Sequence, residues 1–589
     1  MLIMNNKENT YSFKYFFNNY RSRYLLGIVW LVLVDALQLV IPWLLGDFTD
    51  RLQLRTIQMR GIIYYALIII GVAILTAIFR YLWRLYIVGT SQLLEKQIRE
   101  NFYDHLLKLS TNYFNEQKTG DLMAHATNDI KAVRQAMGPG VVMFFDALFL
   151  TVATITILLF KIDIRLTLIA LIPLPFLAII STYFSKTIHE KFTAVQEAFS
   201  NLTDKVQENF SGIRVIKAFT QEDKEIEKFA SANKLNFEKN IDLIKTWGLF
   251  HPMIQFITAL SFLIVIWYGG TLVIQGVISL GDFVAFNSYL GLLTWPMMAV
   301  GFVINLLQRG TASLKRLNKI FAEEEEIYDK DVLDIDSING EIEFKDLSFK
   351  YNEDEDYVLK NINLDLNHGE TTGILGRTGS GKTTIVNLLL RLFNVNNNEI
   401  FIDGHDINSL AIKLLRKEIG IVPQDNFLFS STIADNIAFF DPLNTGREEI
   451  EKAAKITEIY DDIMEFPNGF DTILGERGVT LSGGQKQRIS MARALIKKPK
   501  ILILDDSFSA VDTQTEEKIL NNLEPVMKNR TVILISHRIS TLKNTDKIFV
   551  LEEGQILERG THQELIENEQ LYYDIYQKQQ LEEKIANIN

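Results

Sequence analysis

The sequence predicts an all-α domain of six membrane-spanning helices with long cytoplasmic helical extensions, followed by an α/β domain. The first half holds six long apolar stretches, and the second half alternates short β-rich runs with helical stretches. Charge divides the chain in the same way. Residues 1–320 carry 31 Lys and Arg against 23 Asp and Glu, a net charge of +8, whereas residues 321–589 carry a net charge of −20. The two halves therefore belong in different environments.

The overall composition excludes several classes of protein. The 589 residues are 48% hydrophobic and 22% charged, which is neither a disordered nor a low-complexity composition. The chain has no cysteine, so it forms no disulfide, thiolate metal site or cysteine nucleophile. The formal net charge of −12 would argue against a nucleic-acid partner if it described both halves, but it averages two unlike ones. No nucleic-acid partner is predicted.

Each apolar stretch is long enough to span a bilayer, for which a helix needs about 20 apolar residues. Soluble folds rarely keep six runs of this length uncharged, so membrane lipid is expected around them. The predicted transmembrane domain is residues 1–322. Its spans are residues 24–46, 61–79, 139–160, 166–185, 249–273 and 283–308.

The loops between these spans alternate in length and in charge. The long loops (residues 90–138 and 186–245), the N-terminal segment and the segment after the last span hold 24 Lys and Arg, and the short loops hold five. The positive-inside rule therefore places both termini and both long loops in the cytoplasm. We expect a multi-pass protein of the cell membrane with a cytoplasmic C-terminal domain.

Two carboxylates, Asp35 and Asp146, lie inside the first and third spans. A charge facing lipid costs several kcal/mol, so both side chains should face the helix bundle or a cavity. They are candidate cation or proton contacts in a substrate path. The alternative, a protonated or hydrogen-bonded packing role, stays equally open.

A strongly acidic linker, residues 323–338, follows the last span, and a C-terminal tail covers residues 578–589. Between them, residues 339–577 have the pattern of an α/β domain with a largely parallel sheet. The β-rich runs include residues 341–344, 372–375, 400–402, 419–422, 501–504 and 531–535.

The strand at residues 372–375 runs into a phosphate-binding loop, because residues 376–383 fit G-x-x-x-x-G-K-[ST]. The glycines let backbone N–H groups face phosphate oxygens, and Lys382 reaches the terminal phosphates. Thr383 is expected to hold Mg²⁺. The predicted nucleotide-binding residues here are Gly376, Arg377, Thr378, Gly379, Ser380, Gly381, Lys382, Thr383 and Thr384.

Two further motifs complete the chemistry. The apolar strand at residues 501–504 ends in Asp505, whose carboxylate is placed to bind Mg²⁺ through water. A Ser-Gly-Gly-Gln sequence precedes a helix and can form an anion-binding nest of backbone N–H groups. Its residues are Ser482, Gly483, Gly484 and Gln485.

Taken together, these motifs resemble the ATP-binding cassette (ABC) transporter family. The resemblance implies that Leu481–Gln485 is the signature motif, which contacts the γ-phosphate of ATP held by a second nucleotide domain. It implies that Tyr351 stacks on adenine and that Gln424 senses Mg²⁺ and the attacking water. It also implies that Ser509–Asp512 is the dimer-crossing loop and that His537 is the γ-phosphate switch.

The resemblance extends over essentially the whole chain. Gly475–Gly478 is similar to a loop found in exporters of the family, and six spans with one cassette look like an exporter half-transporter. The regions around Phe114–Asp121 and Asn209–Glu222 would then hold the helices that dock on the cassettes. The resemblance implies ATP-driven export of hydrophobic or amphiphilic compounds of the multidrug type, with ATP and Mg²⁺ as cofactors.

One residue departs from the family pattern. Asp506 stands where the family normally places a glutamate that polarises the attacking water. The shorter side chain shifts the carboxylate by about 1 Å, and such a misplacement can cost about 10²-fold in rate. Together with the intact signature, this substitution predicts pairing with a non-identical half-transporter, in which this chain contributes the poorly hydrolysing site.

Two alternatives remain open for the transported substrate and for the activity. Lipid flipping and peptide export use the same fold and motifs. Because of Asp506, an ATP-binding regulatory or channel subunit with little hydrolysis is also possible.

Overall fold

A computed structural model describes residues 11–352, 354–475 and 481–586 of the chain. The chain divides into two compact units. The first comprises Met1–Lys108 and Gln117–Glu324, and the second comprises Leu109–Glu116 and Glu325–Asn589. A helical first unit and an α/β second unit confirm the predicted fold class.

The first unit is entirely helical. Its elements are α1 (Phe13–Asn19), α2 (Arg21–Gln53), α3 (Met59–Trp83), η1 (Arg84–Val88), α4 (Gly89–Lys108), α6 (Thr119–Ala124), η2 (His125–Asp129), α7 (Ile130–Gln135), η3 (Ala136–Gly140), α8 (Val141–Ile157), η4 (Leu158–Ile162), α9 (Ile164–Leu171), α10 (Leu174–Ser211), α11 (Ile213–Ala218), α12 (Glu222–Ile264), η5 (Val265–Gly269), α13 (Gly270–Ile274) and α14 (Leu280–Phe321).

Six helical segments among the described residues are long and apolar enough to cross a membrane. They are Arg21–Gln53, Met59–Lys108, Thr119–Ile162, Ile164–Ser211, Glu222–Ile274 and Leu280–Phe321. Each contains one of the apolar stretches of the sequence. Most of the segments are much longer than a bilayer requires, because their polar parts continue the helices beyond the apolar stretch.

Residues 166–185, which are predicted to form one span, do not form a single continuous helix. Helix α9 ends at Leu171 and α10 begins at Leu174. Pro173 and Pro175 explain the break, since proline lacks an N–H and fits a helix only in its first turn.

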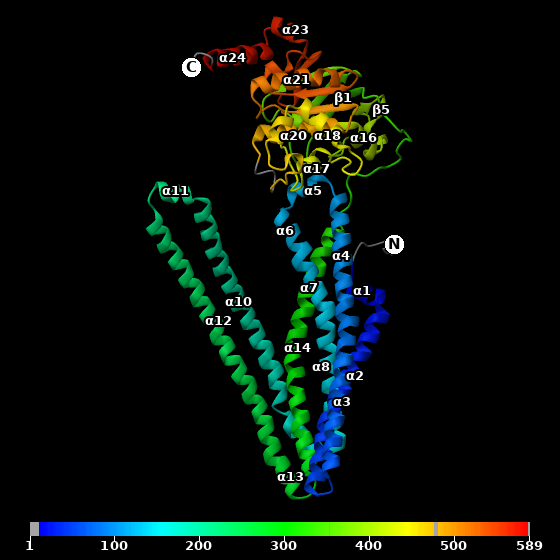
Figure 1. Cartoon of the computed structure of the whole chain (residues 1–589), viewed down its shortest axis with the longest axis vertical. Helices are drawn as coiled ribbons and strands as arrows, with labels where there is room; N and C mark the ends of the chain where they lie inside the picture. Colours follow the sequence, from blue (N-terminus) through cyan, green and yellow to red (C-terminus); the bar gives the residue numbers. More distant parts are fainter. Residues whose placement is uncertain (1–10, 353, 476–480, 587–589) are drawn as a thin grey trace. The chain divides into compact units, whose positions relative to one another are not determined.

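Helices of the first unit pack on one another around buried apolar side chains. Helix α14 contacts α2, α8 and α10, and α2 also contacts α3 and α8. Figure 1 shows α10 and α12 side by side, joined by α11, and diverging from α14 toward that tip. Phe286, Leu290 and Leu293 of α14 are fully buried in the core of this unit.

The start of α14 is fixed against the end of α2. Ser279 caps α14, and its hydroxyl also donates to the Asp50 carboxylate at 2.6 Å. The Gly281 N–H donates to the same carboxylate at 2.6 Å. A Cβ at Gly281 would lie 2.2 Å from the Gly46 carbonyl oxygen, so only glycine permits this close approach.

The second unit combines two sheets with surrounding helices. Its elements are α5 (Thr111–Glu116), β1 (Ile342–Phe349), β2 (Leu359–Leu366), β3 (Thr371–Gly376), α15 (Lys382–Leu389), β4 (Ile400–Ile402), β5 (His405–Asp406), η6 (Ile407–Ser409), α16 (Ile412–Glu418), β6 (Ile419–Val422), α17 (Ile433–Ile437), α18 (Arg447–Ile456), α19 (Tyr460–Met464), η7 (Gly469–Asp471), α20 (Gly483–Ile496), β7 (Ile501–Asp505), α21 (Thr513–Met527), β8 (Thr531–Ile535), α22 (Ile539–Leu542), β9 (Lys547–Glu552), β10 (Gln555–Gly560), α23 (His562–Glu567) and α24 (Leu571–Ala586).

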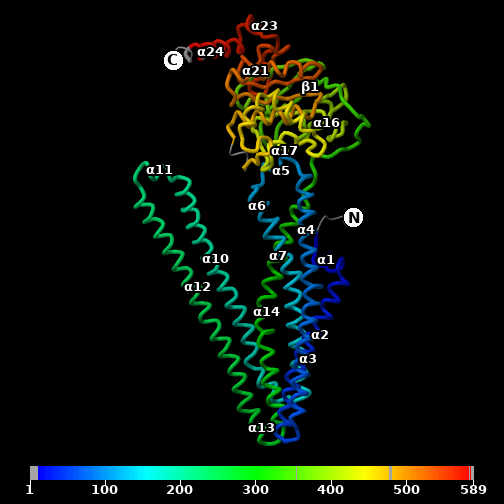
Figure 2. The backbone as a smooth tube through the Cα atoms, viewed as in Figure 1, coloured from blue at the N-terminus to red at the C-terminus, as the bar shows by residue number. Residues whose placement is uncertain are grey.

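The six-stranded sheet positions the functional residues. Its order is β10-β9-β3-β8-β7-β6, and all neighbours except β10 and β9 are parallel. Strands β7 and β8 are buried along their whole length, which explains their continuous apolar sequences. The four-stranded antiparallel sheet has the order β2-β1-β4-β5. Figure 2 traces how the chain returns repeatedly through this unit between residues 340 and 560.

Candidate functional site

The parallel strands bring their carboxyl ends together at one edge of the sheet. Strand β3 ends at Gly376, β7 ends at Asp505, and β8 ends two residues before His537. Gln424 follows β6 in the same way. Residues that are far apart in the sequence therefore meet at this edge.

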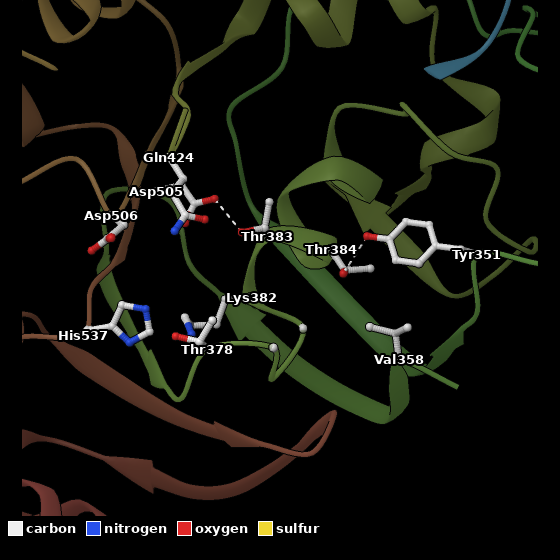
Figure 3. A pocket seen from close by; sticks show the side chains of 12 residues that line it. Tyr351, Val358, Thr378, Lys382, Thr383, Thr384, Gln424, Asp505, Asp506 and His537 are labelled. Carbon is white, nitrogen blue, oxygen red and sulfur yellow. Dashed lines mark hydrogen bonds between the residues drawn. The ribbon is translucent and has the colours of Figure 1, made fainter. Parts of the chain in front are cut away.

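A cavity of about 270 Å³ lies at this edge, and Figure 3 shows the side chains around it. Its lining residues come from the ends of the parallel strands, the loop after β3 and the segment between β1 and β2. They are Tyr351, Val358, Thr378, Gly379, Gly381, Lys382, Thr383, Thr384, Gln424, Asp505, Asp506 and His537. Every one except Val358 is a site residue predicted from the sequence.

The loop from β3 to α15 needs its glycines. Gly379 and Gly381 have φ angles of +83° and +101°, a region that side chains with a Cβ rarely adopt. A Cβ at Gly381 would also lie 2.6 Å from Leu359 Cδ2. The loop can therefore turn tightly into α15, whose N-terminus carries a partial positive charge suited to phosphate.

Lys382 lies across this loop. Its Nζ donates to the carbonyl oxygens of Gly376 at 2.9 Å and Arg377 at 2.7 Å. The side chain is nearly buried, and burial lowers the pKa of its ammonium, while Asp505 and Asp506 act in the opposite direction. A buried cation held in a glycine-rich loop is suited to bind the phosphates of a nucleotide.

Thr383 and Asp505 are joined directly. The Thr383 hydroxyl donates to Asp505 Oδ2 at 2.9 Å. Burial raises the pKa of the Asp505 carboxyl, and the hydrogen bond from Thr383 opposes that rise. A hydroxyl and a carboxylate are hard oxygen ligands, so this pair fits Mg²⁺. A divalent cation bound here would favour the ionised form of the Asp505 carboxyl group.

Tyr351 lines the side of the cavity opposite His537 (Figure 3). Its hydroxyl shares a hydrogen bond with Thr384 Oγ1 at 2.9 Å. The ring packs edge-on against Phe393, with centroids 5.0 Å apart. Together with Val358 it provides an apolar and aromatic surface suited to a nucleobase.

Asp506 directly follows the metal-site aspartate and lines the cavity. Its backbone is left-handed, with φ of +46°, a conformation that aspartate tolerates better than most residues. Its N–H donates to the Ile535 carbonyl at 2.9 Å, which fixes it beside the loop that carries His537. Figure 3 shows Asp506 and His537 on the same side of the cavity.

Several predicted residues lie outside this cavity. The Ser482 hydroxyl accepts from the Gln485 N–H at 3.2 Å, and the Gln485 side chain accepts from the Ser482 N–H at 3.0 Å. This capping box begins α20, where a second nucleotide could be bound by exposed N–H groups. The remaining predicted nucleotide-binding residues that do not line the cavity are Gly376, Arg377, Ser380, Gly483 and Gly484.

Asp35 and Asp146 lie in the first unit and take no part in this cavity. Most of the predicted exporter-type loop, residues 476–478, lies outside the described residues.

Sequence reasoning missed two glutamines that support the site. Gln487 of α20 bonds to the loop after Asp506, and Gln579 of α24 bonds to the loop of His537. Both contacts join elements that are distant in the chain. No motif or spacing marks these glutamines in the sequence.

Comparisons with known proteins cover both units. Residues 24–297 match the profile of the ABC transporter transmembrane region, and residues 359–509 match the ABC transporter profile. The chain is 39% identical to the probable multidrug resistance ABC transporter ATP-binding/permease protein YheI of Bacillus subtilis, over 96% of this chain and 97% of that protein. It is 38% identical to the multidrug resistance-like ATP-binding protein MdlA of Escherichia coli, over 96% of each.

Two further matches extend the comparison. The chain is 35% identical to an ATP-dependent lipid A-core flippase of Syntrophus aciditrophicus, over 83% of this chain and 81% of that protein. The structure of a bacterial Atm1-family ABC exporter with ATP bound is similar, with a TM-score of 0.76 and 27% identity. That similarity covers 95% of this chain and 98% of the solved chain.

Proposed function

The chain belongs to the ABC transporter family, and from that premise we propose that it exports hydrophobic or amphiphilic compounds of the multidrug type as the weakly hydrolysing half of a heterodimer. As a member of the family, it is a multi-pass protein of the cell membrane with a cytoplasmic ATP-binding domain that hydrolyses ATP to drive transport. Multidrug export is supported by the relatives named for multidrug resistance.

The observation that carries the heterodimer proposal is Asp506. It lies in the cavity beside Gln424 and His537, where the family places a glutamate. Its carboxylate is one methylene short of that position, so a water molecule in line with the γ-phosphate would be poorly polarised. The signature residues of α20 are present in full, and they can complete a competent ATP site on a partner that supplies its own glutamate.

The proposed cycle uses the residues around the cavity and the start of α20. Tyr351 and Val358 hold the base, the loop after β3 and Lys382 bind the phosphates, and Ser482–Gln485 clamps ATP bound by the partner. Mg²⁺, when bound at Thr383 and Asp505, would neutralise charge on the transferred phosphate. Binding two ATP molecules favours the closed pair of cassettes, and loss of the γ-phosphate reverses that preference.

A lipid is the second candidate substrate, because one relative is named a lipid A-core flippase. Lipids and multidrug substrates are both amphiphilic, so the two proposals use the same kind of path through the first unit.

An ATP-binding regulatory subunit with little hydrolysis is the other alternative that Asp506 allows. ATP-dependent movement of a substrate into proteoliposomes would exclude that regulatory role.

The ATPase rate of the purified chain tests the heterodimer proposal. We expect slow turnover for the chain alone and fast turnover when it is purified with a half-transporter that has the glutamate. Asp506→Glu should raise the rate of the chain alone by about 10²-fold, because it restores the position of the carboxylate. Lys382→Ala is the control that removes phosphate binding. Fast turnover of the chain alone, unchanged by Asp506→Glu, would refute the heterodimer and leave the export activity standing.

A further inference from the structure

The short loop between α2 and α3 carries more positive charge than is usual for its side of the membrane. Five of the six spans separate this loop from the cytoplasmic C-terminal domain, so it lies on the outer side. Figure 1 shows it at the same end of the first unit as α13. The loop and the helix ends beside it contain Arg51, Arg55 and Arg60. Basic residues are depleted from outer loops as a rule, so these three arginines point to a local role for positive charge.

A cavity of about 630 Å³ lies between the outer ends of α2 and α3. Its lining residues on α2 recur at helical spacing and share one face of that helix. They are Val40, Trp43, Leu44, Asp47 and Arg51. The rise along the helix from Val40 to Arg51 is about 16 Å. This is about half of the roughly 30 Å hydrocarbon thickness of a bilayer, so the depth of the cavity matches one leaflet, the outer one.

The polarity of the cavity changes along this depth. Val40 of α2 and Ile68 of α3 line the end nearer the membrane centre, and Arg60 lines the outer end. The rings of Trp43 and Tyr64, which also line the cavity, are 61% and 63% exposed. Exposed tryptophan and tyrosine rings in a membrane protein favour the level of the lipid headgroups. A ligand that fits this cavity is therefore apolar at its inner end and polar at its outer end.

The charges in this cavity do not cancel. Among the described residues, three charged side chains line it, namely Asp47, Arg51 and Arg60. Asp47 pairs with Arg51 at 3.1 Å and accepts a hydrogen bond from the Tyr65 hydroxyl. The Arg60 side chain has no hydrogen bond or ion pair with any described residue. One positive charge is left over, and it complements a phosphate diester, to which a guanidinium can donate two parallel hydrogen bonds.

These features fit an anionic phospholipid better than they fit other ligands. A free phosphate ion would gain nothing from the apolar wall at Val40 and Ile68. A zwitterionic lipid brings an ammonium group, and the carboxylate that could bind it, Asp47, already has two partners. A neutral amphiphile would leave the charge of Arg60 unpaired at the edge of a medium of low dielectric constant.

We propose that the cavity between the outer ends of α2 and α3 binds one anionic phospholipid of the outer leaflet, with its phosphate on Arg60 and an acyl chain along Val40 and Ile68. The lipid fills the space between the two helices and joins their outer ends. It is a bound lipid and not a transported one, so the proposal goes beyond the export function and does not depend on which compound is exported.

Native mass spectrometry of the full-length chain in detergent tests this site. The protein is titrated with dioleoyl phosphatidylglycerol, with dioleoyl phosphatidylcholine and with glycerol phosphate, which has the phosphate but no acyl chain. We expect the first molecule of phosphatidylglycerol to bind about tenfold more tightly than phosphatidylcholine, and glycerol phosphate not to bind. Equal binding of the two lipids, or binding of glycerol phosphate with the affinity of phosphatidylglycerol, would overturn the phospholipid site.

Two substitutions with opposite expected effects test the role of charge. Arg60→Gln should weaken binding of phosphatidylglycerol about tenfold and leave phosphatidylcholine unchanged. Asp47→Asn should tighten binding of phosphatidylglycerol, because it releases Arg51 and raises the charge of the cavity, while asparagine still accepts a hydrogen bond from Tyr65. Arg55→Gln is the matched control, because Arg55 is an exposed arginine of the same loop that does not line the cavity.

The same measurements show which results contradict the proposal. Unchanged binding of phosphatidylglycerol in Arg60→Gln, or an equal loss in Arg55→Gln, would show that Arg60 does not hold the phosphate. Weaker binding in Asp47→Asn would show that the charge of the cavity does not select the lipid. If Arg60→Gln does not fold, the direction of the change in Asp47→Asn decides the matter.

Discussion

At the scale of single residues, the side-chain amide of Gln579 holds the loop that carries His537. Its Nε2 donates to the His537 carbonyl at 2.7 Å, and its Oε1 accepts from the Ile539 N–H at 2.9 Å. The C-terminal helix α24 therefore fixes the backbone on both sides of residue 538. His537 itself lines the nucleotide cavity, so its position depends on a residue 42 positions later in the chain.

We expect Gln579→Ala to lower the kcat for ATP hydrolysis by about tenfold and to leave the ATP concentration at half-maximal rate nearly unchanged. Two hydrogen bonds are lost, and His537 is no longer held in position relative to the γ-phosphate. The rate is measured in the Asp506→Glu background, where this chain's own site hydrolyses. Gln577→Ala is the matched control, because Gln577 is exposed and its side-chain amide donates to the Tyr573 hydroxyl of the same helix. A fall in thermal stability with no change in kcat would show a purely structural role.

At the scale of elements, hydrogen bonds and close packing join α20 to the loop after β7. Gln487 of α20 donates to the Ser509 hydroxyl at 2.8 Å and accepts from the Ala510 N–H at 3.0 Å. A Cβ at Gly484 would lie 2.8 Å from the Ala510 carbonyl oxygen, so the start of α20 rests directly on this loop. The helix begins at the signature residues and the loop begins at Asp506, so these contacts join the signature to the loop beside the nucleotide cavity.

Gln487→Leu should therefore reduce cooperativity between the two ATP sites of the dimer. We expect the Hill coefficient for ATP to fall toward 1 while ATP binding at the cavity is unchanged, since Gln487 does not line it. ATPase rates across a range of ATP concentrations measure the coefficient, and equilibrium binding of an ATP analogue measures the affinity. Gln514→Leu, an exposed glutamine on α21, is the control. An unchanged Hill coefficient would show that the contact only stabilises the fold.

Much at this scale could be predicted from the sequence. The phosphate-binding loop, the β7 aspartate and the apolar stretches depend on local patterns, and the structure brings Lys382, Thr383 and Asp505 together around one cavity. The break between α9 and α10 has a local cause in Pro173 and Pro175 that the hydropathy of the stretch conceals. The roles of Gln487 and Gln579 had no local signal, because they depend on contacts between elements that only the folded chain brings together.

At the scale of the whole molecule, the parts of α10 and α12 beyond the apolar stretches, together with the segment that joins the two helices, expose many apolar side chains. Phe199, Phe210, Phe219 and Phe237 are 54%, 74%, 71% and 62% exposed, and all lie outside the apolar membrane stretches. Apolar side chains concentrated on a water-facing surface indicate a contact with another protein. Because half-transporters of this family dimerise, the second subunit is the expected occupant of this surface.

Replacing two of these phenylalanines should weaken the dimer without unfolding the chain. The double variant Phe210→Ala/Phe219→Ala removes both exposed rings. This loss should weaken the free energy of association by about 1–3 kcal/mol. We expect less partner to co-purify and the ATPase rate of the complex to fall about tenfold. Phe176→Ala is the matched control, because Phe176 is 55% exposed but lies inside an apolar membrane stretch, where we expect lipid to cover it. Co-purification and turnover equal to those of the unchanged complex would show that the second subunit binds another surface.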